Sequence, residues 1–111
     1  MTHPLLMDTE TLQERLGQPG LVIVDVRGKS AYEFGGHIPG AVHTTWHEYS
    51  DPNAIPKGLL NPDLAQIERQ LAALGISNDS EVVIYSNPFD NWGDEGRMFW
   101  MLEYLGHQNL K

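Results

Sequence analysis

Two apolar runs of the chain lack the alternation of apolar and polar residues that a half-exposed strand shows. They are residues 21–26, "LVIVDV", and residues 81–86, "EVVIYS". A strand that is covered on both faces is apolar along most of its length. We therefore predict two buried strands, the first of them at the centre of a sheet.

Apolar residues recur at helical spacing in the segments around these runs. The first such segment has Asp8 or Thr9 as its N-terminal cap, and Gly17 ends it. Residues 29–46 predict a helical turn, a break at a Gly-Gly pair and a short strand that begins near Ala41.

Two longer helices are predicted further along the chain. The first has Asn61 as its N-terminal cap, Pro62 as its first residue and Gly75 as its C-terminal cap. Its apolar face is formed by Leu64, Ile67, Leu71 and Leu74. The second spans residues 94–107, where early acidic residues suit the helix dipole and Gly106 ends the pattern.

Alternating strands and helices predict an α/β fold in which helices flank a parallel sheet, as one domain over residues 1–111. Folds of this kind hold their ligands beyond the carboxyl ends of the strands. Asp25 and Arg27 leave the first predicted strand, and Ser86 leaves the last. These three residues are the first candidates for chemistry.

The net charge of the chain limits the kinds of partner that it can bind. Fifteen acidic and seven basic side chains give a net charge of −8, which repels nucleic acids and anionic membrane surfaces. No apolar run reaches the roughly 18 residues of a membrane-spanning helix, and no secretory signal is visible. We expect a cytoplasmic protein that binds neither nucleic acid nor membrane.

Cysteine is absent from the sequence. Its absence excludes disulfides, thiolate metal sites and a cysteine nucleophile within this chain. His43 and His47 have a spacing that suits a metal only on a helix, whereas their segment predicts strand and loop. We expect neither a metal nor another cofactor.

Each candidate also has a structural interpretation. Asp25 and Arg27 are expected to form an ion pair at the strand end rather than to act as catalytic groups. His37 is expected to fix the turn that contains it. It is also the only plausible local base for a Ser86 nucleophile, and we expect no such hydrolase chemistry.

Arg97, in the predicted helix over residues 94–107, has two possible roles. Arg97 either lines an anion site, as a weak candidate for substrate binding, or neutralises Asp94 or Glu95.

Aromatic residues gather in and before the same helix and form a candidate interface patch. They are Trp92, Phe99, Trp100 and Tyr104. We expect Phe99 and Trp100 in the core and the loop residue Trp92 at a domain interface.

Residues 24–43, "VDVRGKSAYEFGGHIPGAVH", resemble the signature of the rhodanese (thiosulfate sulfurtransferase) family. The motif residues are Asp25, Arg27, His37, Pro39 and Gly40. Residues 82–111 are similar to the strand that precedes the family's active loop and to the helix that follows it. The resemblance implies a rhodanese-like α/β fold. The family continues beyond the position of Lys111, so we expect the chain to lack the C-terminal strand and helix of the fold.

In active members of the family, the strand that corresponds to residues 82–85 delivers a cysteine into a loop of inward-pointing backbone N–H groups. The thiolate accepts sulfane sulfur there as a persulfide. The resemblance places Ser86 at the cysteine position, and a serine hydroxyl cannot hold a persulfide. The loop that follows is also long, and it carries Asp90, Asp94 and Glu95, which repel thiosulfate.

In these differences from the active members, the chain resembles the non-catalytic N-terminal half of a two-domain sulfurtransferase. The implied partner is a second rhodanese domain or chain with the catalytic cysteine, which moves sulfur from thiosulfate or mercaptopyruvate to cyanide or a thiol. This half then forms a wall of the cleft, to which His37 or Trp92 contributes. The alternative is a stand-alone, inactive binding or regulatory module. A rhodanese-fold phosphatase is excluded, because the chain has no Cys-x5-Arg loop.

Overall fold

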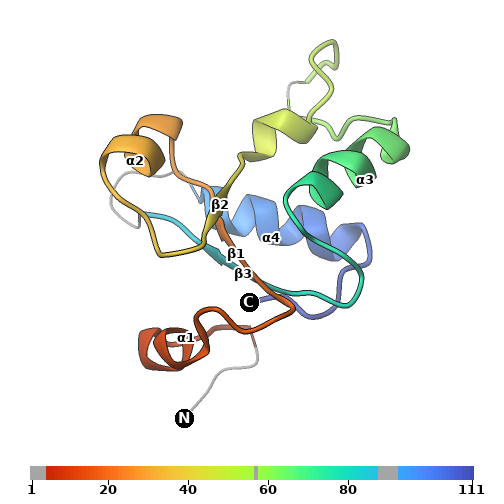
Figure 1. The fold of residues 1–111 in the computed structure, drawn as a ribbon. Coiled ribbons are helices and arrows are strands. Elements are labelled where there is room, and N and C mark those ends of the chain that lie inside the picture. Colours follow the sequence, from red (N-terminus) through yellow and green to blue (C-terminus); the bar gives the residue numbers. More distant parts are fainter. Residues whose placement is uncertain (1–4, 57, 88–92) are drawn as a thin grey trace.

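The structure is a computed structural model, and it describes residues 5–56, 58–87 and 93–111 (Figure 1). Helices and strands alternate along the chain, as predicted. The elements are α1 (Thr9–Arg15), β1 (Leu21–Asp25), α2 (Lys29–Phe34), β2 (Val42–His43), the short 3-10 helix η1 (Trp46–Tyr49), α3 (Leu64–Ala73), β3 (Glu81–Tyr85) and α4 (Asp94–Tyr104).

The three strands form one parallel sheet in the order β2-β1-β3, which confirms the central position of β1. Asp25 and Tyr85 lie opposite each other at the carboxyl ends of their strands. The last residues of the chain run beside the outer edge of β3. There the N–H of Val82 donates to the carbonyl of Asn109 at 2.9 Å, and the N–H of Lys111 donates to the carbonyl of Val82 at 2.8 Å.

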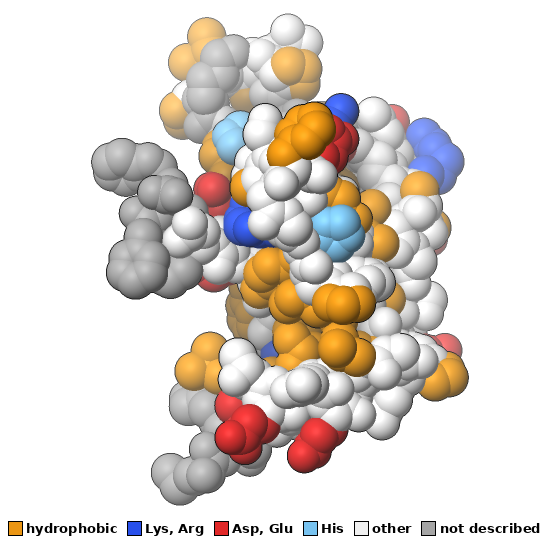
Figure 2. All heavy atoms as spheres, turned by 60° about the vertical axis from the view of Figure 1, so that its left-hand side comes forward, with side chains coloured by type: hydrophobic (Ala, Val, Ile, Leu, Met, Phe, Trp, Pro, Cys, Tyr) orange, Lys and Arg blue, Asp and Glu red, His pale blue; other side chains and the backbone are white. Residues whose placement is uncertain are grey.

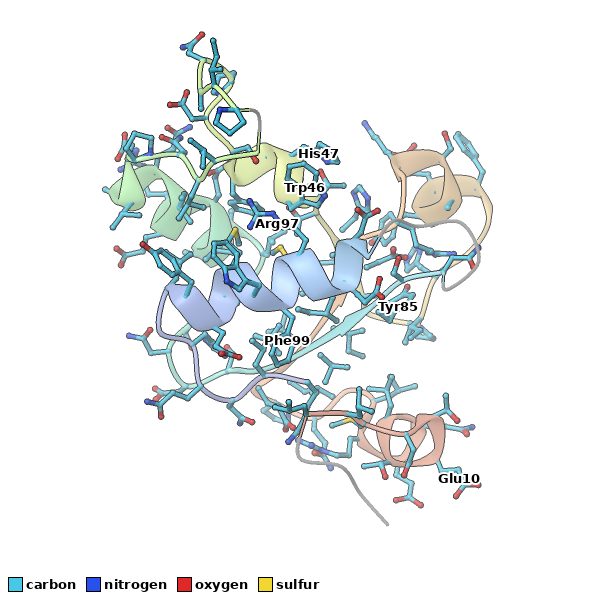
Figure 3. All side chains as sticks on the ribbon, turned by 180° about the vertical axis from the view of Figure 1, so that it is seen from behind. Glu10, Trp46, His47, Tyr85, Arg97 and Phe99 are labelled. Carbon is cyan, nitrogen blue, oxygen red and sulfur yellow. The ribbon has the colours of Figure 1, made fainter. Side chains whose placement is uncertain are left out.

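The main core lies between the sheet and the two C-terminal helices. Helix α4 crosses the face of the sheet that is turned toward the viewer in Figure 3, and α3 lies beside it. The most deeply buried members of this core are Val24, Val26, Tyr49, Ile67, Val82, Met98, Met101 and Leu102. Each large apolar side chain buried in this way stabilises the fold by about 1.5–3 kcal/mol.

The strand residues next to these core positions point to the other face of the sheet. Ile23 and Val83 are buried there. Helix α1 is tied to β3 by an ion pair between the Arg15 guanidinium and the Glu81 carboxylate. Figure 2 shows hydrophobic side chains gathered in the middle of one side of the molecule, with acidic side chains below them at the α1 end.

The predicted helix ends are correct at α1 and wrong at α3. The Asp8 carboxylate caps α1 by accepting from the N–H of Thr11 at 2.7 Å. Asn61 does not cap α3: the helix begins at Leu64, and Asp63 is its cap, accepting from the N–H of Gln66 at 3.1 Å. Pro62 therefore lies before the helix rather than at its first position.

The C-terminal cap of α3 lies one residue before the predicted Gly75, and Gly106 ends α4 as predicted. The cap residues are Leu74 and Leu105. Gly75 and Gly106 come directly after them with φ of +91° and +96°, a left-handed conformation that favours glycine. Among the described residues, no helix has both the length and the apolar character needed to span a bilayer.

Candidate functional site

The carboxyl ends of β1 and β3 meet at one edge of the sheet, where their last residues are joined by a hydrogen bond. Asp25 is fully buried, and the Tyr85 hydroxyl donates to its Oδ2 at 2.7 Å. The strand register places the two residues opposite each other. The sequence analysis missed Tyr85, although a tyrosine at the end of an aliphatic run is a signal for it.

Arg27 supplies the charge that balances Asp25. Its backbone N–H donates to Oδ1 at 2.9 Å, and its Nη2 donates to Oδ2 at 2.6 Å. Nε lies at hydrogen-bond distance from both carboxylate oxygens. The guanidinium carbon is also 5.5 Å from the centre of the Tyr85 ring. Asp25, Arg27 and Tyr85 therefore form one connected group, which we call the strand-end network.

The strand-end network holds the loop of residues 36–41. Nη2 of Arg27 donates to the carbonyl of Gly36 at 2.7 Å, and the N–H of Ile38 donates to the Tyr85 hydroxyl at 3.1 Å. At the end of the loop, the Tyr32 hydroxyl donates to the carbonyl of Ala41 at 2.6 Å. The loop is therefore fixed to both strands and to α2.

Pro39 and Gly40 make the turn inside this loop. The N–H of Ala41 donates to the carbonyl of Ile38 at 2.9 Å, which closes a β-turn around the two residues. Gly40 has φ of +82°, the value that a type II turn requires at its third position, and proline suits the second. Both motif residues are thus explained by backbone conformation.

His37 lies in the loop as an exposed residue. Its Nδ1 is hydrogen-bonded with the carbonyl of Tyr32 at 2.9 Å, and its ring stacks on the Tyr32 ring with centres 3.9 Å apart. The ring of His43 also stacks on this tyrosine, with centres 5.2 Å apart, and its Nε2 is hydrogen-bonded with the carbonyl of Arg27 at 2.6 Å.

The pKa values in the strand-end network are shifted by burial and by hydrogen bonds together. Burial raises the pKa of the Asp25 carboxyl, but hydrogen bonds from Arg27 and Tyr85 outweigh burial and bring this pKa below its usual value. The hydrogen bonds to Asp25 raise the pKa of Arg27. Burial, and then the hydrogen bond to Asp25, raise the pKa of Tyr85. At neutral pH the network is therefore an anion, a cation and a neutral hydroxyl, which suits a structural group rather than a proton carrier.

Ser86 directly follows β3 and is half-buried. Nδ1 of His37, the candidate base, is hydrogen-bonded with the carbonyl of Tyr32. Trp92 and Asp90 lie outside the described residues.

Arg97 has partners that the sequence did not indicate. Its Nη2 donates to the carbonyl of Gly58, and its guanidinium carbon lies over two indole rings, 5.3 Å from the centre of Trp46 and 4.7 Å from that of Trp100 (Figure 3). The expected ion pair with Asp94 or Glu95 is not among the ion pairs of the described residues. That Arg97 neutralises Asp94 or Glu95 stays a prediction.

Two aromatic predictions have different outcomes. Phe99 packs against the core, as predicted. Trp100 is 50% exposed, so its predicted place in the core is wrong. Its ring stacks on that of Tyr104, which is 67% exposed, with centres 5.3 Å apart.

The histidines near η1 are engaged in other contacts. The ring of His47 stacks on that of Trp46 with centres 3.8 Å apart. Within residues 5–56, 58–87 and 93–111, no three metal-ligating side chains come together as a cluster.

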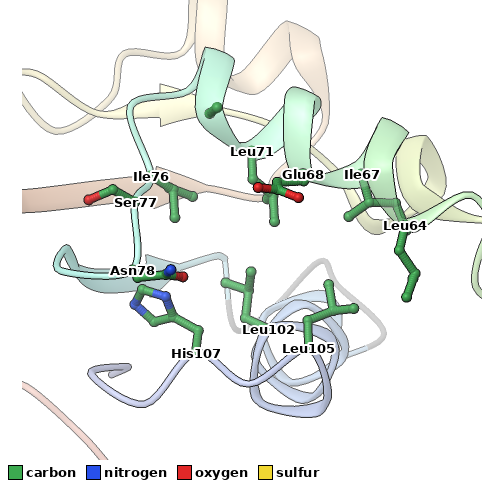
Figure 4. Close-up of a pocket in the computed structure, with 11 residues that line it drawn as sticks. Leu64, Ile67, Glu68, Leu71, Ile76, Ser77, Asn78, Leu102, Leu105 and His107 are labelled. Atoms are coloured by element: carbon green, nitrogen blue, oxygen red, sulfur yellow. The ribbon is translucent and has the colours of Figure 1, made fainter.

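A cavity of about 560 Å³ lies away from the predicted site, between α3 and the end of α4 (Figure 4). Its walls are mostly leucine and isoleucine side chains from the two helices. Polar groups at its border include Glu68, Asn78 and His107, and the imidazole of His107 is hydrogen-bonded with the carbonyl of Ser80 at 2.8 Å. None of the predicted site residues lines it.

Comparison with known proteins gives a consistent set of relatives. A family model described as "Rhodanese-like domain" matches residues 8–111. The thiosulfate sulfurtransferase of Pseudomonas aeruginosa is 33% identical over 111 residues, which cover 96% of this chain and 38% of that protein. The sulfur carrier protein TtuD of Thermus thermophilus is 30% identical over 98% of this chain and 37% of its own length.

Solved structures agree with the sequence relatives. The crystal structure of SseA from Escherichia coli, described with the 3-mercaptopyruvate sulfotransferases, superposes with a TM-score of 0.71 at 25% identity, over 92% of this chain and 41% of that one. The chain therefore spans about two fifths of the length of the relatives that it matches. The match over residues 8–111 and the shared parallel sheet show that the chain belongs to the rhodanese-like domain family.

Proposed function

We propose that this chain is the N-terminal, non-catalytic rhodanese domain of a sulfurtransferase. In this enzyme, a cysteine on a second domain or chain takes sulfane sulfur from thiosulfate or mercaptopyruvate as a persulfide and passes it to cyanide or a thiol. This domain supplies a wall of the cleft and no nucleophile. The proposed location is the cytoplasm.

One observation carries the proposal: a rhodanese-like fold whose sequence contains no cysteine. Ser86 follows β3 at the position where the family resemblance places the nucleophile. The lengths of the relatives support a further domain, since this chain matches only 37–38% of two curated proteins, the first a thiosulfate sulfurtransferase.

The fixed loop of residues 36–41 supports a contribution from His37. The strand-end network holds this loop at the carboxyl edge of the sheet, and its histidine is exposed. In the proposed enzyme, His37 faces the catalytic loop of the partner domain, and Trp92 lies at the interface between domains.

The proposal is tested on the native polypeptide that carries this sequence. Its intact mass is measured before and after treatment with iodoacetamide, and sulfur transfer from thiosulfate to cyanide is assayed on the same sample. We expect a mass above 12.5 kDa, or a second polypeptide in equal amount, together with alkylation and transfer activity that alkylation abolishes.

The 111-residue chain alone is the matched control. We expect no alkylation and no transfer from it, because a serine hydroxyl cannot carry the persulfide. A native species of 12.5 kDa that is neither alkylated nor active would contradict the enzyme and leave the stand-alone binding or regulatory module.

A further inference from the structure

Arg97 is held in place from several sides. One N–H of its guanidinium is used by the carbonyl of Gly58, and its charge lies over the faces of Trp46 and Trp100. These contacts come from η1, from the loop before α3 and from α4 itself. Because the side chain is already ordered, a ligand that binds it pays little of the entropy cost of fixing a flexible arginine.

Arg97 forms none of the ion pairs found in the described part of the chain. The ion pairs there join Arg15 to Glu81, Arg27 to Asp25 and Lys29 to Glu33.

Asp94, on the same helix, is hydrogen-bonded to one of the two indoles. Asp94 lies one turn before Arg97, and its Oδ1 accepts from the indole Nε1 of Trp46 at 3.1 Å. This hydrogen bond fixes the indole against which the guanidinium packs. The carboxylate therefore orients one wall of the site.

Large aromatic surface beside the cation is left open to solvent. Trp100 is 50% exposed, and Tyr104, stacked on it, is 67% exposed. On the other side, His47 stacks on Trp46 and is also exposed. Exposed aromatic side chains around one arginine are the composition of a binding surface, since tryptophan, tyrosine and arginine carry most of the binding energy in such surfaces.

We propose that Arg97, Trp46 and Trp100 form a binding site for one carboxylate, carried by a ligand with an aromatic or apolar body. The remaining N–H donors of the guanidinium pair with the two carboxylate oxygens, because the planar fork of arginine matches a carboxylate in a bidentate arrangement. The exposed faces of Trp100 and Tyr104 cover the body of the ligand.

The charge of the chain selects among anions. A net charge of −8 opposes a dianion such as thiosulfate or phosphate more strongly than a monoanion. A monocarboxylate gains both from pairing with the guanidinium and from burying its apolar body against the rings. The same chemistry is present in a free organic acid and at the C-terminal carboxylate of a polypeptide that ends in an aromatic residue. The site is independent of sulfur transfer.

The site is tested on the 111-residue chain by following the indole N–H signals of its tryptophans in a nuclear magnetic resonance titration. The probes are benzoate and, as its neutral analogue of the same shape, benzamide. We expect benzoate to shift the signals of Trp46 and Trp100, and benzamide to bind at least tenfold more weakly.

Variants assign the effect to the guanidinium. Arg97→Gln should weaken benzoate binding at least tenfold, and Arg97→Lys several-fold, since lysine keeps the charge and loses the fork. Arg69→Gln removes a cation from the exposed side of α3 and should leave binding unchanged. If Arg97→Gln fails to fold, Trp100→Ala, at a half-exposed position, should weaken binding in its place.

A second pair of probes identifies the source of the carboxylate. They are a five-residue peptide that ends in phenylalanine with a free C-terminal carboxylate, and the same peptide with a C-terminal amide. Tighter binding of the peptide acid than of benzoate supports a polypeptide ligand, and the reverse supports a free acid. Equal binding of benzoate and benzamide, or unchanged benzoate binding by Arg97→Gln, would overturn the site.

Discussion

At the scale of single residues, the fold depends on a carboxylate that is completely withdrawn from water. Asp25 is tolerated there because Arg27 and Tyr85 direct N–H and O–H donors at both of its oxygens. Replacing it by asparagine leaves the arginine without its counter-charge, and breaking a buried pair in this way costs about 3 kcal/mol or more. We expect Asp25→Asn to lower the free energy of unfolding by this amount in urea at neutral pH.

The pH dependence of this loss has a definite sign. Because the pKa of Asp25 in the folded protein lies below its ordinary value of 3.8, the unfolded state binds more protons in acid. The contribution of Asp25 is present above that value and is lost as the pH falls through the lowered one. The difference between wild type and Asp25→Asn should therefore shrink in acid. Asp79→Asn, at an exposed position, is the control, and an equal effect of both substitutions would contradict the argument.

A substitution of Tyr85 gives a second test of the strand-end network. Tyr85→Phe removes the hydroxyl that donates to Asp25 and accepts from the N–H of Ile38. A hydrogen bond to a charged group is worth about 1.5–3 kcal/mol, and we expect a loss of stability in this range. The amide hydrogen of Ile38 should also exchange faster with solvent. Tyr104→Phe, which changes an exposed tyrosine, should do neither.

The sequence predicts contacts between near neighbours better than contacts across the fold. Asp25 and Arg27 are two residues apart at a strand end, so their pairing is readable from the sequence. The hydroxyl of Tyr85 reaches Asp25 only because the two strands pair in a particular register. Arg97 has acids close by along the chain, yet two of its partners, Gly58 and Trp46, come from 39 and 51 residues away.

At the scale of elements, two residues near the start of α3 could each cap the helix, and the sequence alone does not decide between them. Asn61 followed by Pro62 satisfies the usual rule for a helix start, but it is the Asp63 carboxylate that accepts from an N–H in the first turn of the helix, that of Gln66. Asn61 accepts from the N–H of Asp63 at 3.0 Å and so shapes the turn before it. We expect Asp63→Ala to cost about 1 kcal/mol in urea unfolding and Asn61→Ala to cost less. The opposite order would restore Asn61 as the cap.

Helix α4 shows why element type was easier to predict than orientation. Its sequence "MFWMLEYL" is apolar almost all round, so periodicity identifies a helix but not the side that faces the sheet. The structure buries Met98, Met101 and Leu102 and leaves Trp100 half exposed. The choice depends on packing against β3 and η1, which no local pattern in α4 contains.

At the scale of the whole molecule, the alternation of strands and helices was sufficient to predict a parallel sheet. It was also sufficient to predict that the candidate site lies at the carboxyl edge of this sheet. Parallel strands joined by helices allow few arrangements, and the apolar run of β1 requires neighbours on both sides. The family motif lies at this edge because its residues fix a loop between two strand ends. The Arg97 site has no such signature, since tertiary contacts bring η1 and the loop before α3 to the arginine on α4.

The net charge of −8 sets the response of the molecule to salt. Fifteen acids on a chain of this length repel one another in the compact state, and added salt screens this repulsion. The ion pair inside the strand-end network is screened little because Asp25 is buried. Sodium chloride should therefore raise the midpoint of urea unfolding at neutral pH. Near pH 4.8, where the sequence has no net charge, the increase should vanish, because Asp25 is still ionised there and only the overall repulsion is gone. A salt effect of the same size at both pH values would show that screening of net charge is not its cause.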